Sequence, residues 1–94
     1  MTRERDEVLD EWLVLRCQGG DARAVELLAR AWHPRLLRRA AILTGRPDAA
    51  ADVAQEAWLG IVRGLGRLKD PASFRGWAYR CVRSRTRSGS RRER

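Results

Sequence analysis

The chain has 94 residues, enough for one small domain, and its net charge is +8 at pH 7. It contains no apolar run of about 18 residues and opens with charged residues, which excludes a membrane-spanning helix and a secretory leader, so we expect a cytoplasmic protein. Residues 1–62 hold nine arginines and ten acidic residues, whereas residues 63–94 hold eleven basic and two acidic residues. This segregation favours an anionic partner for the last third, most often nucleic acid and less often an acidic membrane surface.

Helical periodicity dominates the chain, which shows neither an alternating strand pattern nor an internal repeat. We therefore predict an all-α fold, a compact bundle of about four helices spanning residues 6–18, 22–43, 47–68 and 72–87. Residues 1–87 form one domain in this interpretation. Residues 88–94 hold no apolar side chain and are expected to form a flexible basic tail.

Proline and glycine mark the expected irregularities. Pro34 lies inside the second helix, where it removes a backbone hydrogen bond to Arg30 and predicts a kink or a helix split in two. Pro47 suits the first position of the third helix. Glycines in the second half of that helix predict either a close approach by a neighbouring helix or a frayed end: they are Gly60, Gly64 and Gly66.

Each expected helix carries one tryptophan that fits its apolar stripe, so the four rings are predicted to share an aromatic core. They are Trp12, Trp32, Trp58 and Trp77. In the first helix, the stripe predicted to face the core consists of Val8, Leu9, Trp12, Leu13 and Arg16.

Residues 49–62 project as a helix with two different faces. The apolar arc is expected to face the core and consists of Ala50, Val53, Ala54, Ala57, Trp58 and Ile61. The opposite arc is polar but includes Leu59 and Val62, which resemble an apolar hot spot inside a polar rim. Its candidate partner-binding residues are Asp52, Gln55, Glu56, Leu59 and Val62. The alternative is that these are surface apolar residues of no function, which are common.

The sequence gives no sign of enzyme chemistry. His33 is the only histidine, and no sequence neighbour offers a nucleophile to pair with it. Cys17 and Cys81 belong to no CxxC or Cys/His cluster and are expected to be ordinary buried thiols. Asp52 and Glu56 alone would make a weak metal site. We therefore expect no catalytic residue, no metal and no cofactor.

The last expected helix has a basic face that suits nucleic acid. Its arginines flank Tyr79, an arrangement that can contact phosphates while the ring stacks on an unpaired base. The preceding loop offers small polar groups that can line a pocket for an extruded base. The candidate DNA-binding residues are Lys69, Asp70, Ser73, Arg75, Tyr79, Arg80, Arg83 and Arg87. A solvated basic face without a function is the alternative.

In this order and at these spacings, several motifs resemble region 2 of bacterial sigma factors, specifically of the extracytoplasmic-function (ECF) group. They cover residues 13–92 and are Gly20-Asp21-x-x-Ala24, Leu43-Thr44-Gly45, Ala51-Asp52-Val53-x-Gln55-Glu56-x-Trp58-Leu59, Phe74-Arg75-x-Trp77 and Tyr79-Arg80-Cys81-Val82-Arg83.

The resemblance implies that the third helix docks on the clamp coiled coil of the RNA polymerase β′ subunit through its candidate partner-binding residues. It also implies that the following loop and the last helix, including Ser84, recognise and melt the minus-ten promoter element and hold a flipped non-template base. The expected partners are core RNA polymerase and promoter DNA, especially its single-stranded minus-ten region. An anti-sigma factor is a further candidate partner, and no membrane is expected.

The sequence departs from the family pattern at three positions. Ser84 stands where the family usually has Asn, Ser88 where it has Asp, and Arg46 replaces the usual acidic cap before the third helix. The family also continues into a second promoter-reading domain, which we do not expect here. Two other functions therefore stay open: a basic bundle that binds nucleic acid without polymerase, and a regulator that sequesters an anti-sigma factor.

Overall fold

The computed structural model describes residues 5–92, with side chains placed for residues 6–87. Its elements in chain order are α1 (Arg5–Gln18), α2 (Ala22–Thr44), α3 (Pro47–Gly64), the 3₁₀ turns η1 (Leu65–Arg67) and η2 (Pro71–Ser73), and α4 (Phe74–Arg92). No strand occurs in this part of the chain. The prediction of an all-α bundle of four helices is confirmed.

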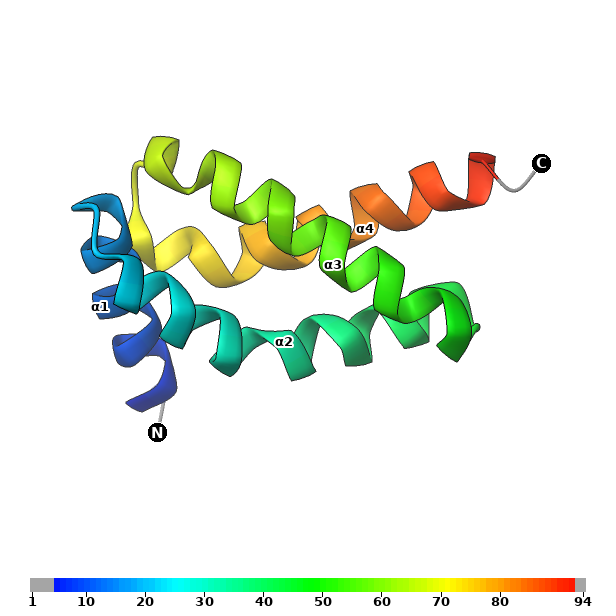
Figure 1. The fold of residues 1–94 in the computed structure, drawn as a ribbon, viewed down its shortest axis with the longest axis horizontal. Helices are drawn as coiled ribbons and strands as arrows, with labels where there is room; N and C mark the ends of the chain where they lie inside the picture. Colours follow the sequence, from blue (N-terminus) through cyan, green and yellow to red (C-terminus); the bar gives the residue numbers. More distant parts are fainter. Residues whose placement is uncertain (1–4, 93–94) are drawn as a thin grey trace.

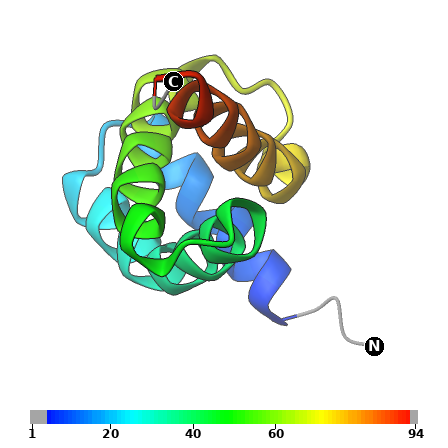
Figure 2. The ribbon, with the colours of Figure 1, turned by 90° about the vertical axis from the view of Figure 1, so that its right-hand side faces the viewer.

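The helices α2, α3 and α4 run along the length of the molecule, and α1 crosses one end of them (Figure 1). α2 and α3 form an antiparallel hairpin, and α4 packs against both, as the end view shows (Figure 2). α1 contacts α2, α4 and the two 3₁₀ turns between α3 and α4. The hairpin turns at Gly45, whose φ of 69° favours glycine.

The core is built around Trp32 of α2, which is fully buried. Its ring meets Phe74 edge-on and Tyr79 at a tilt, each with ring centroids 5.2 Å apart. Such aromatic pairs add about 0.5–1.5 kcal/mol beyond the burial of their area. The predicted core face of α3 is confirmed, with Trp58 partly buried and the rest buried: Ala50, Val53, Ala54, Ala57 and Ile61.

The rotation of α1 differs from the prediction. Its buried side chains are Asp10, Leu13 and Val14. The predicted stripe is exposed apart from Leu13: the exposed members are Val8, Leu9, Trp12 and Arg16. The helix can bury an aspartate because Arg35 of α2 and Arg75 of α4 each place a guanidinium nitrogen 3.4 Å from a carboxylate oxygen of Asp10. A charge paired in this way is tolerated in a buried position.

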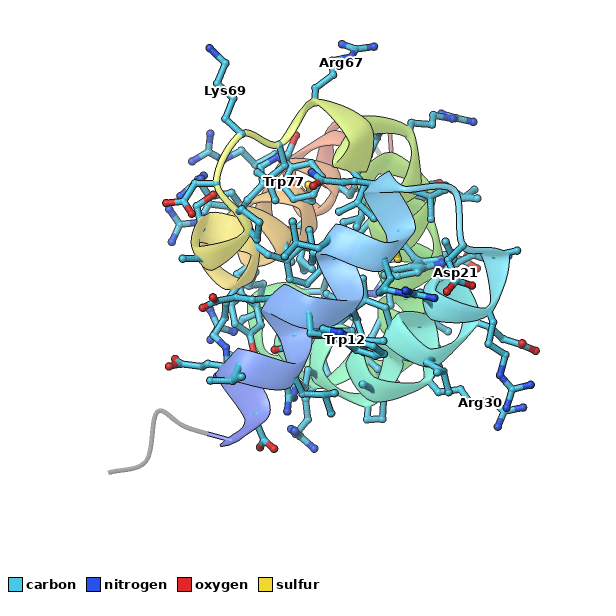
Figure 3. All side chains as sticks on the ribbon, turned by 90° about the vertical axis from the view of Figure 1, so that its left-hand side faces the viewer. Trp12, Asp21, Arg30, Arg67, Lys69 and Trp77 are labelled. Atoms are coloured by element: carbon cyan, nitrogen blue, oxygen red, sulfur yellow. The ribbon has the colours of Figure 1, made fainter. Side chains whose placement is uncertain are left out.

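The predicted aromatic core is correct for Trp32 and wrong for Trp12. Trp58 and Trp77 are partly buried and pack against the core, whereas Trp12 is 53% exposed. Trp12 lies on the outer side of α1 (Figure 3), with the guanidinium of Arg16 5.6 Å from its ring centroid.

Three predicted helix features are corrected. α3 ends at Gly64 rather than at residue 68, and the 3₁₀ turn η1 follows it. α2 continues through Pro34 without a break, because Trp32 and Leu36 on either side are fully buried and hold it in place. α4 ends at Arg92 rather than at residue 87, so residues 88–92 of the predicted flexible tail are helical, and residues 93–94 lie outside the described residues. Each added helical residue gains a hydrogen bond, and no proline follows to stop α4.

Gly64 allows a close approach of α4 to the end of α3, which was one of the two predicted alternatives. A Cβ at this position would lie 2.9 Å from Cζ2 of Trp77. We expect Gly64→Ala to lower the free energy of unfolding by about 1 kcal/mol, because overpacking outweighs the helix propensity of alanine. Urea unfolding followed by circular dichroism measures this. Gly66→Ala is the control, since nothing lies within 4 Å of its Cβ position, and equal losses for both variants would contradict the prediction.

The start of α2 is capped by Asp21. Its Oδ1 accepts hydrogen bonds from the backbone N–H groups of Arg23 and Ala24, at 3.0 and 3.3 Å, and its Oδ2 lies 2.9 Å from Nη2 of Arg16. The Arg16 side chain, followed by the Ala24 amide, holds the pKa of Asp21 below its usual value. The ionised form of Asp21 therefore stabilises the fold.

This lowered pKa predicts a pH-dependent stability. A carboxyl group whose pKa falls on folding stabilises the protein above its unfolded pKa of about 3.9, and the contribution is lost as pH falls through the folded pKa. Asp21→Asn keeps a capping side chain but loses the charge. We expect the wild type to be more stable than this variant at about pH 6 and the difference to vanish towards about pH 2. Urea unfolding across this range tests it, and a constant difference would be inconsistent with the prediction.

Candidate nucleic-acid and partner interfaces

The outer side of α3 carries the predicted partner-binding residues, and we name it the α3 face: Asp52, Gln55, Glu56, Leu59 and Val62. Pro47 begins the helix, and the buried stripe on its other side fixes its rotation. Leu59 is 47% exposed and Val62 is 41% exposed. Asp52 and Gln55 are exposed, and Glu56 is half-buried. The fold thus places all five on one side of the helix, as an apolar centre among polar side chains.

The outer side of α4 carries four of the predicted DNA-binding residues, which we name the α4 face: Arg80, Arg83, Ser84 and Arg87. All four side chains are exposed. Within the described part of the chain, no carboxylate lies within ion-pair distance of these arginines. Their guanidinium groups are therefore available to an external anion such as a phosphate.

Tyr79 is less accessible than the sequence suggested. It is half-buried, and its ring packs between Trp32 and the guanidinium of Arg39, which lies 4.2 Å from the ring centroid. A base approaching from outside would meet Arg39 first. Because a guanidinium plane can itself stack on a base, this pair presents Arg39 as the outer surface and Tyr79 as its support.

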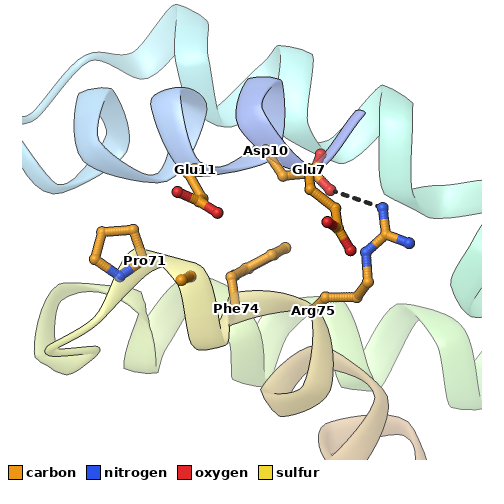
Figure 4. Close-up of a pocket in the computed structure, with 7 residues that line it drawn as sticks. Glu7, Asp10, Glu11, Pro71, Phe74 and Arg75 are labelled. Atoms are coloured by element: carbon orange, nitrogen blue, oxygen red, sulfur yellow. Dashed lines mark hydrogen bonds and ion pairs between the residues drawn. The ribbon is translucent and has the colours of Figure 1, made fainter. Parts of the chain in front are cut away.

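Arg75 is half-buried and lies against α1 and the Trp32 ring. Its Nη2 lies 3.4 Å from Oδ2 of Asp10 (Figure 4). Its guanidinium lies 5.6 Å from the Trp32 ring centroid. Its Nε is buried without a hydrogen-bond partner among the described residues. The structure therefore ties the partly exposed Arg75 to α1, apart from the arginines of the α4 face.

A small pocket lies beside this ion pair, between α1 and the start of α4 (Figure 4). Its volume is about 70 Å³, and it is lined by Glu7, Asp10, Glu11, Pro71, Ala72, Phe74 and Arg75. Small-molecule sites usually measure about 300–1,000 Å³. With three carboxylates in its wall, the pocket is poorly suited to a nucleotide or an extruded base.

The chain between α3 and α4, residues 65–73, is the α3–α4 connection and carries the remaining candidates. Lys69 is exposed and points away from the body (Figure 3). Asp70 caps η2 by accepting the Ala72 N–H at 3.0 Å, and the Ser73 hydroxyl donates to the Asp70 carbonyl at 2.7 Å. Asp70 and Ser73 thus shape the connection, and Arg67 and Lys69 are its exposed cations.

The sequence analysis missed two groups that shape these surfaces. Arg39 belongs to the charge-balanced first part of the chain, yet the fold places it on Tyr79 of α4. The available signal was the Arg38-Arg39 pair, which follows an apolar stretch of α2. Gln18 of α1 donates to the carbonyls of Leu65 and Leu68 in the connection, at 3.0 and 2.8 Å. No local sequence pattern indicates a contact between residues that are 47 and 50 positions apart.

The cysteines are half-buried free thiols. Burial raises the pKa of Cys17, and the nearby charge of Asp21 raises it further. Burial also raises the pKa of Cys81, against the opposing effect of Arg85 and Arg80. Both groups are therefore protonated at neutral pH. Within residues 5–92, no cluster of three or more His, Cys, Asp or Glu side chains is arranged to hold a metal ion, and no helix is long and apolar enough to span a membrane.

Comparison with known proteins agrees with this geometry. Residues 28–94 match the family described as Sigma-70 region 2. The chain is also similar to the RNA polymerase sigma-H factor of Pseudomonas aeruginosa, with 35% identity over 80 residues that cover 85% of this chain and 39% of that protein. The match thus spans about two fifths of the length of this relative. No solved structure matches the chain.

The matched segment contains most of α2 and all of α3 and α4, and so includes the α3 face, the α3–α4 connection and the α4 face. Only α1 and the first turns of α2 precede it. Because the match spans well over half of the chain and includes both candidate surfaces, the chain belongs to the sigma-70 region 2 family.

Proposed function

We propose that this chain acts in transcription initiation as a sigma-factor domain of the ECF group. It binds core RNA polymerase through the α3 face, and the clamp coiled coil of the β′ subunit is the docking site. It contacts the minus-ten promoter element through the α4 face and the α3–α4 connection. These roles place it in the bacterial cytoplasm with the transcription machinery and require no catalytic residue.

The observation that carries this proposal is the separation of two exposed surfaces on neighbouring helices. The α3 face has an apolar centre in Leu59 and Val62, which suits a protein helix as partner. The α4 face is cationic, and its arginines have no carboxylate partner within the described residues. One chain can therefore hold polymerase and DNA at the same time.

On this proposal, melting follows from a preference for the separated strand. Arg80, Arg83 and Arg87 bind phosphates in either form of DNA. The Arg39–Tyr79 stack adds a contact that only an unpaired strand can use, because its bases are free to stack, and we assign Lys69 of the connection to the path of that strand. Ser84 lies on the same surface and supplies a hydroxyl for a base or a phosphate.

The test is retention of the wild-type chain on immobilised core RNA polymerase, followed by binding of a labelled minus-ten oligonucleotide. We expect retention, and we expect the complex to bind the single-stranded oligonucleotide more tightly than its duplex. The free chain should bind both weakly. A chain that is not retained on polymerase would overturn the proposal.

A second candidate function is nucleic-acid binding without polymerase. The unpaired arginines of the α4 face, together with exposed Arg39, favour it. It predicts tight binding of the free chain to duplex DNA, with a steep loss of affinity as salt rises. Titration of the free chain at two salt concentrations separates the two functions.

A further inference from the structure

We infer that Gln18, the last residue of α1, is a positioning residue for the α3–α4 connection. It holds the connection in the shape that meets single-stranded promoter DNA. The contact with DNA rests on the proposed function, whereas the hold itself rests on the hydrogen bonds of the structure. α1 lies outside the residues that match the family, so this role is not part of that match.

The side-chain amide of Gln18 bridges two points of the connection. Its Nε2 donates to the carbonyl of Leu65 at 3.0 Å and to the carbonyl of Leu68 at 2.8 Å, across sequence separations of 47 and 50 residues. The amide group has two N–H donors, and both are used. The two carbonyls belong to the first residue of η1 and to the residue that follows it, so a single side chain fixes the turn that redirects the chain after α3.

Among the described residues, these are the only side-chain hydrogen bonds that tie residues 65–73 to an element distant in the chain. The other hydrogen bonds are local: Leu68 N–H to the Leu65 carbonyl, Ser73 N–H and Oγ to the Asp70 carbonyl, the Asp70 cap on Ala72, and Phe74 N–H to the Pro71 carbonyl. Leu65 is buried and Leu68 is half-buried, whereas Lys69 and Asp70 are exposed. The exposed part therefore depends on the anchored turn before it.

The far end of the connection is held by the same helix. Asp10 of α1 pairs with Arg75 just after η2, and α1 contacts both 3₁₀ turns. α1 thus fixes the start of the connection through Gln18 and its exit through Asp10. Lys69 lies between these anchors, at a set position relative to the arginines of α4.

A fixed connection increases affinity because the ligand does not have to order it. When only a fraction of molecules has the competent shape, the apparent affinity falls by that fraction. The connection is expected to matter for an unpaired strand, which reaches Lys69, and not for duplex DNA, which the α4 face binds through phosphates. Loss of the Gln18 amide should therefore change the preference between the two forms of DNA.

The test compares the wild type with Gln18→Met, which keeps a similar unbranched shape but has no hydrogen-bond donor. With the chain bound to core RNA polymerase, we expect affinity for a single-stranded minus-ten oligonucleotide to fall about five- to tenfold, as expected if the competent fraction drops to that extent. Affinity for the matching duplex and retention on polymerase should stay unchanged. The ratio of the two DNA affinities is the readout, because partial unfolding would lower both equally.

The control is Thr44→Val, at the end of α2 and the opposite end of the bundle (Figure 1), which removes the hydroxyl that donates to the Ala40 and Arg46 carbonyls and accepts from the Arg46 N–H. It should leave the ratio at the wild-type value. Amide hydrogen exchange in the free chain gives a measurement without DNA: residues 66–70 should exchange faster in Gln18→Met than in Thr44→Val.

The outcomes separate the two proposals. A wild type that prefers single strands, with an equal preference in Gln18→Met, overturns the role of Gln18 and leaves the proposed function standing. A wild type that is retained on polymerase but has no such preference overturns the proposed DNA contact and the role of Gln18 together. Faster amide exchange of residues 66–70 in Gln18→Met, together with a reduced ratio of single-strand to duplex affinity, supports the positioning role.

Discussion

Leu59→Glu should weaken binding of the chain to core RNA polymerase by about 2–4 kcal/mol, roughly 30- to 900-fold in affinity. Leu59 is 47% exposed at the apolar centre of the α3 face. The substitution removes an apolar contact at that centre and forces a carboxylate into a desolvated interface, where an unpaired charge is costly. Retention on immobilised polymerase and competition titration measure the loss.

The fold itself should tolerate this substitution. The new carboxylate would lie four residues before Arg63, an arrangement that supports a helix, and surface substitutions usually change stability by at most about 0.5 kcal/mol. Ile42→Glu is the matched control, because it adds the same charge at an apolar residue that is 74% exposed on α2, outside the α3 face. If both variants bind polymerase as the wild type does, the α3 face is not the docking surface.

The double variant Arg80→Ala/Arg83→Ala should weaken DNA binding and leave polymerase binding intact. We expect affinity of the polymerase-bound chain for the minus-ten oligonucleotide to fall about 10- to 100-fold, and the slope of log affinity against log salt to become shallower by about 1.5–2, since two phosphate contacts are lost. Retention on polymerase should not change. Fluorescence anisotropy at several salt concentrations gives both quantities.

The control for this prediction removes the same charge from another surface. Arg23→Ala/Arg30→Ala alters two exposed arginines of α2, of which Arg30 points away from the α3–α4 connection (Figure 3). It should lower DNA affinity much less than the α4 variant. An equal loss in both double variants would mean that net charge, rather than the α4 face, governs binding.

The features that the sequence predicted well are those with a local cause. Pro47 fixes where α3 begins, and the apolar residues that recur from Ala50 to Ile61 fix its rotation, so the exposure of Leu59 and Val62 followed directly. The position of Arg80, Arg83 and Arg87 on the outside of α4 followed from the same rule. In both cases the apolar periodicity within a single helix is enough to predict which of its side chains are exposed.

The features that it predicted poorly depend on partners far away in the chain. The periodicity of α1 favoured burial of Trp12, because no local pattern shows that Arg35 and Arg75 would make room for a buried Asp10. For the same reason no local pattern showed that Arg75 would lie against Asp10, or that Tyr79 would be held between Trp32 and Arg39 of α2. The assignment of Arg75 and Tyr79 to DNA binding stays a prediction.

The Asp10–Arg75 pair has a consequence for synthesis in the cell. The two residues are separated by 65 positions, so α1 leaves the ribosome well before the arginine that partners its buried carboxylate. At about 5–20 residues per second, this delay is roughly 3–13 s. During that interval α1 cannot complete its packing, and the last helix to be made is the one that closes the domain.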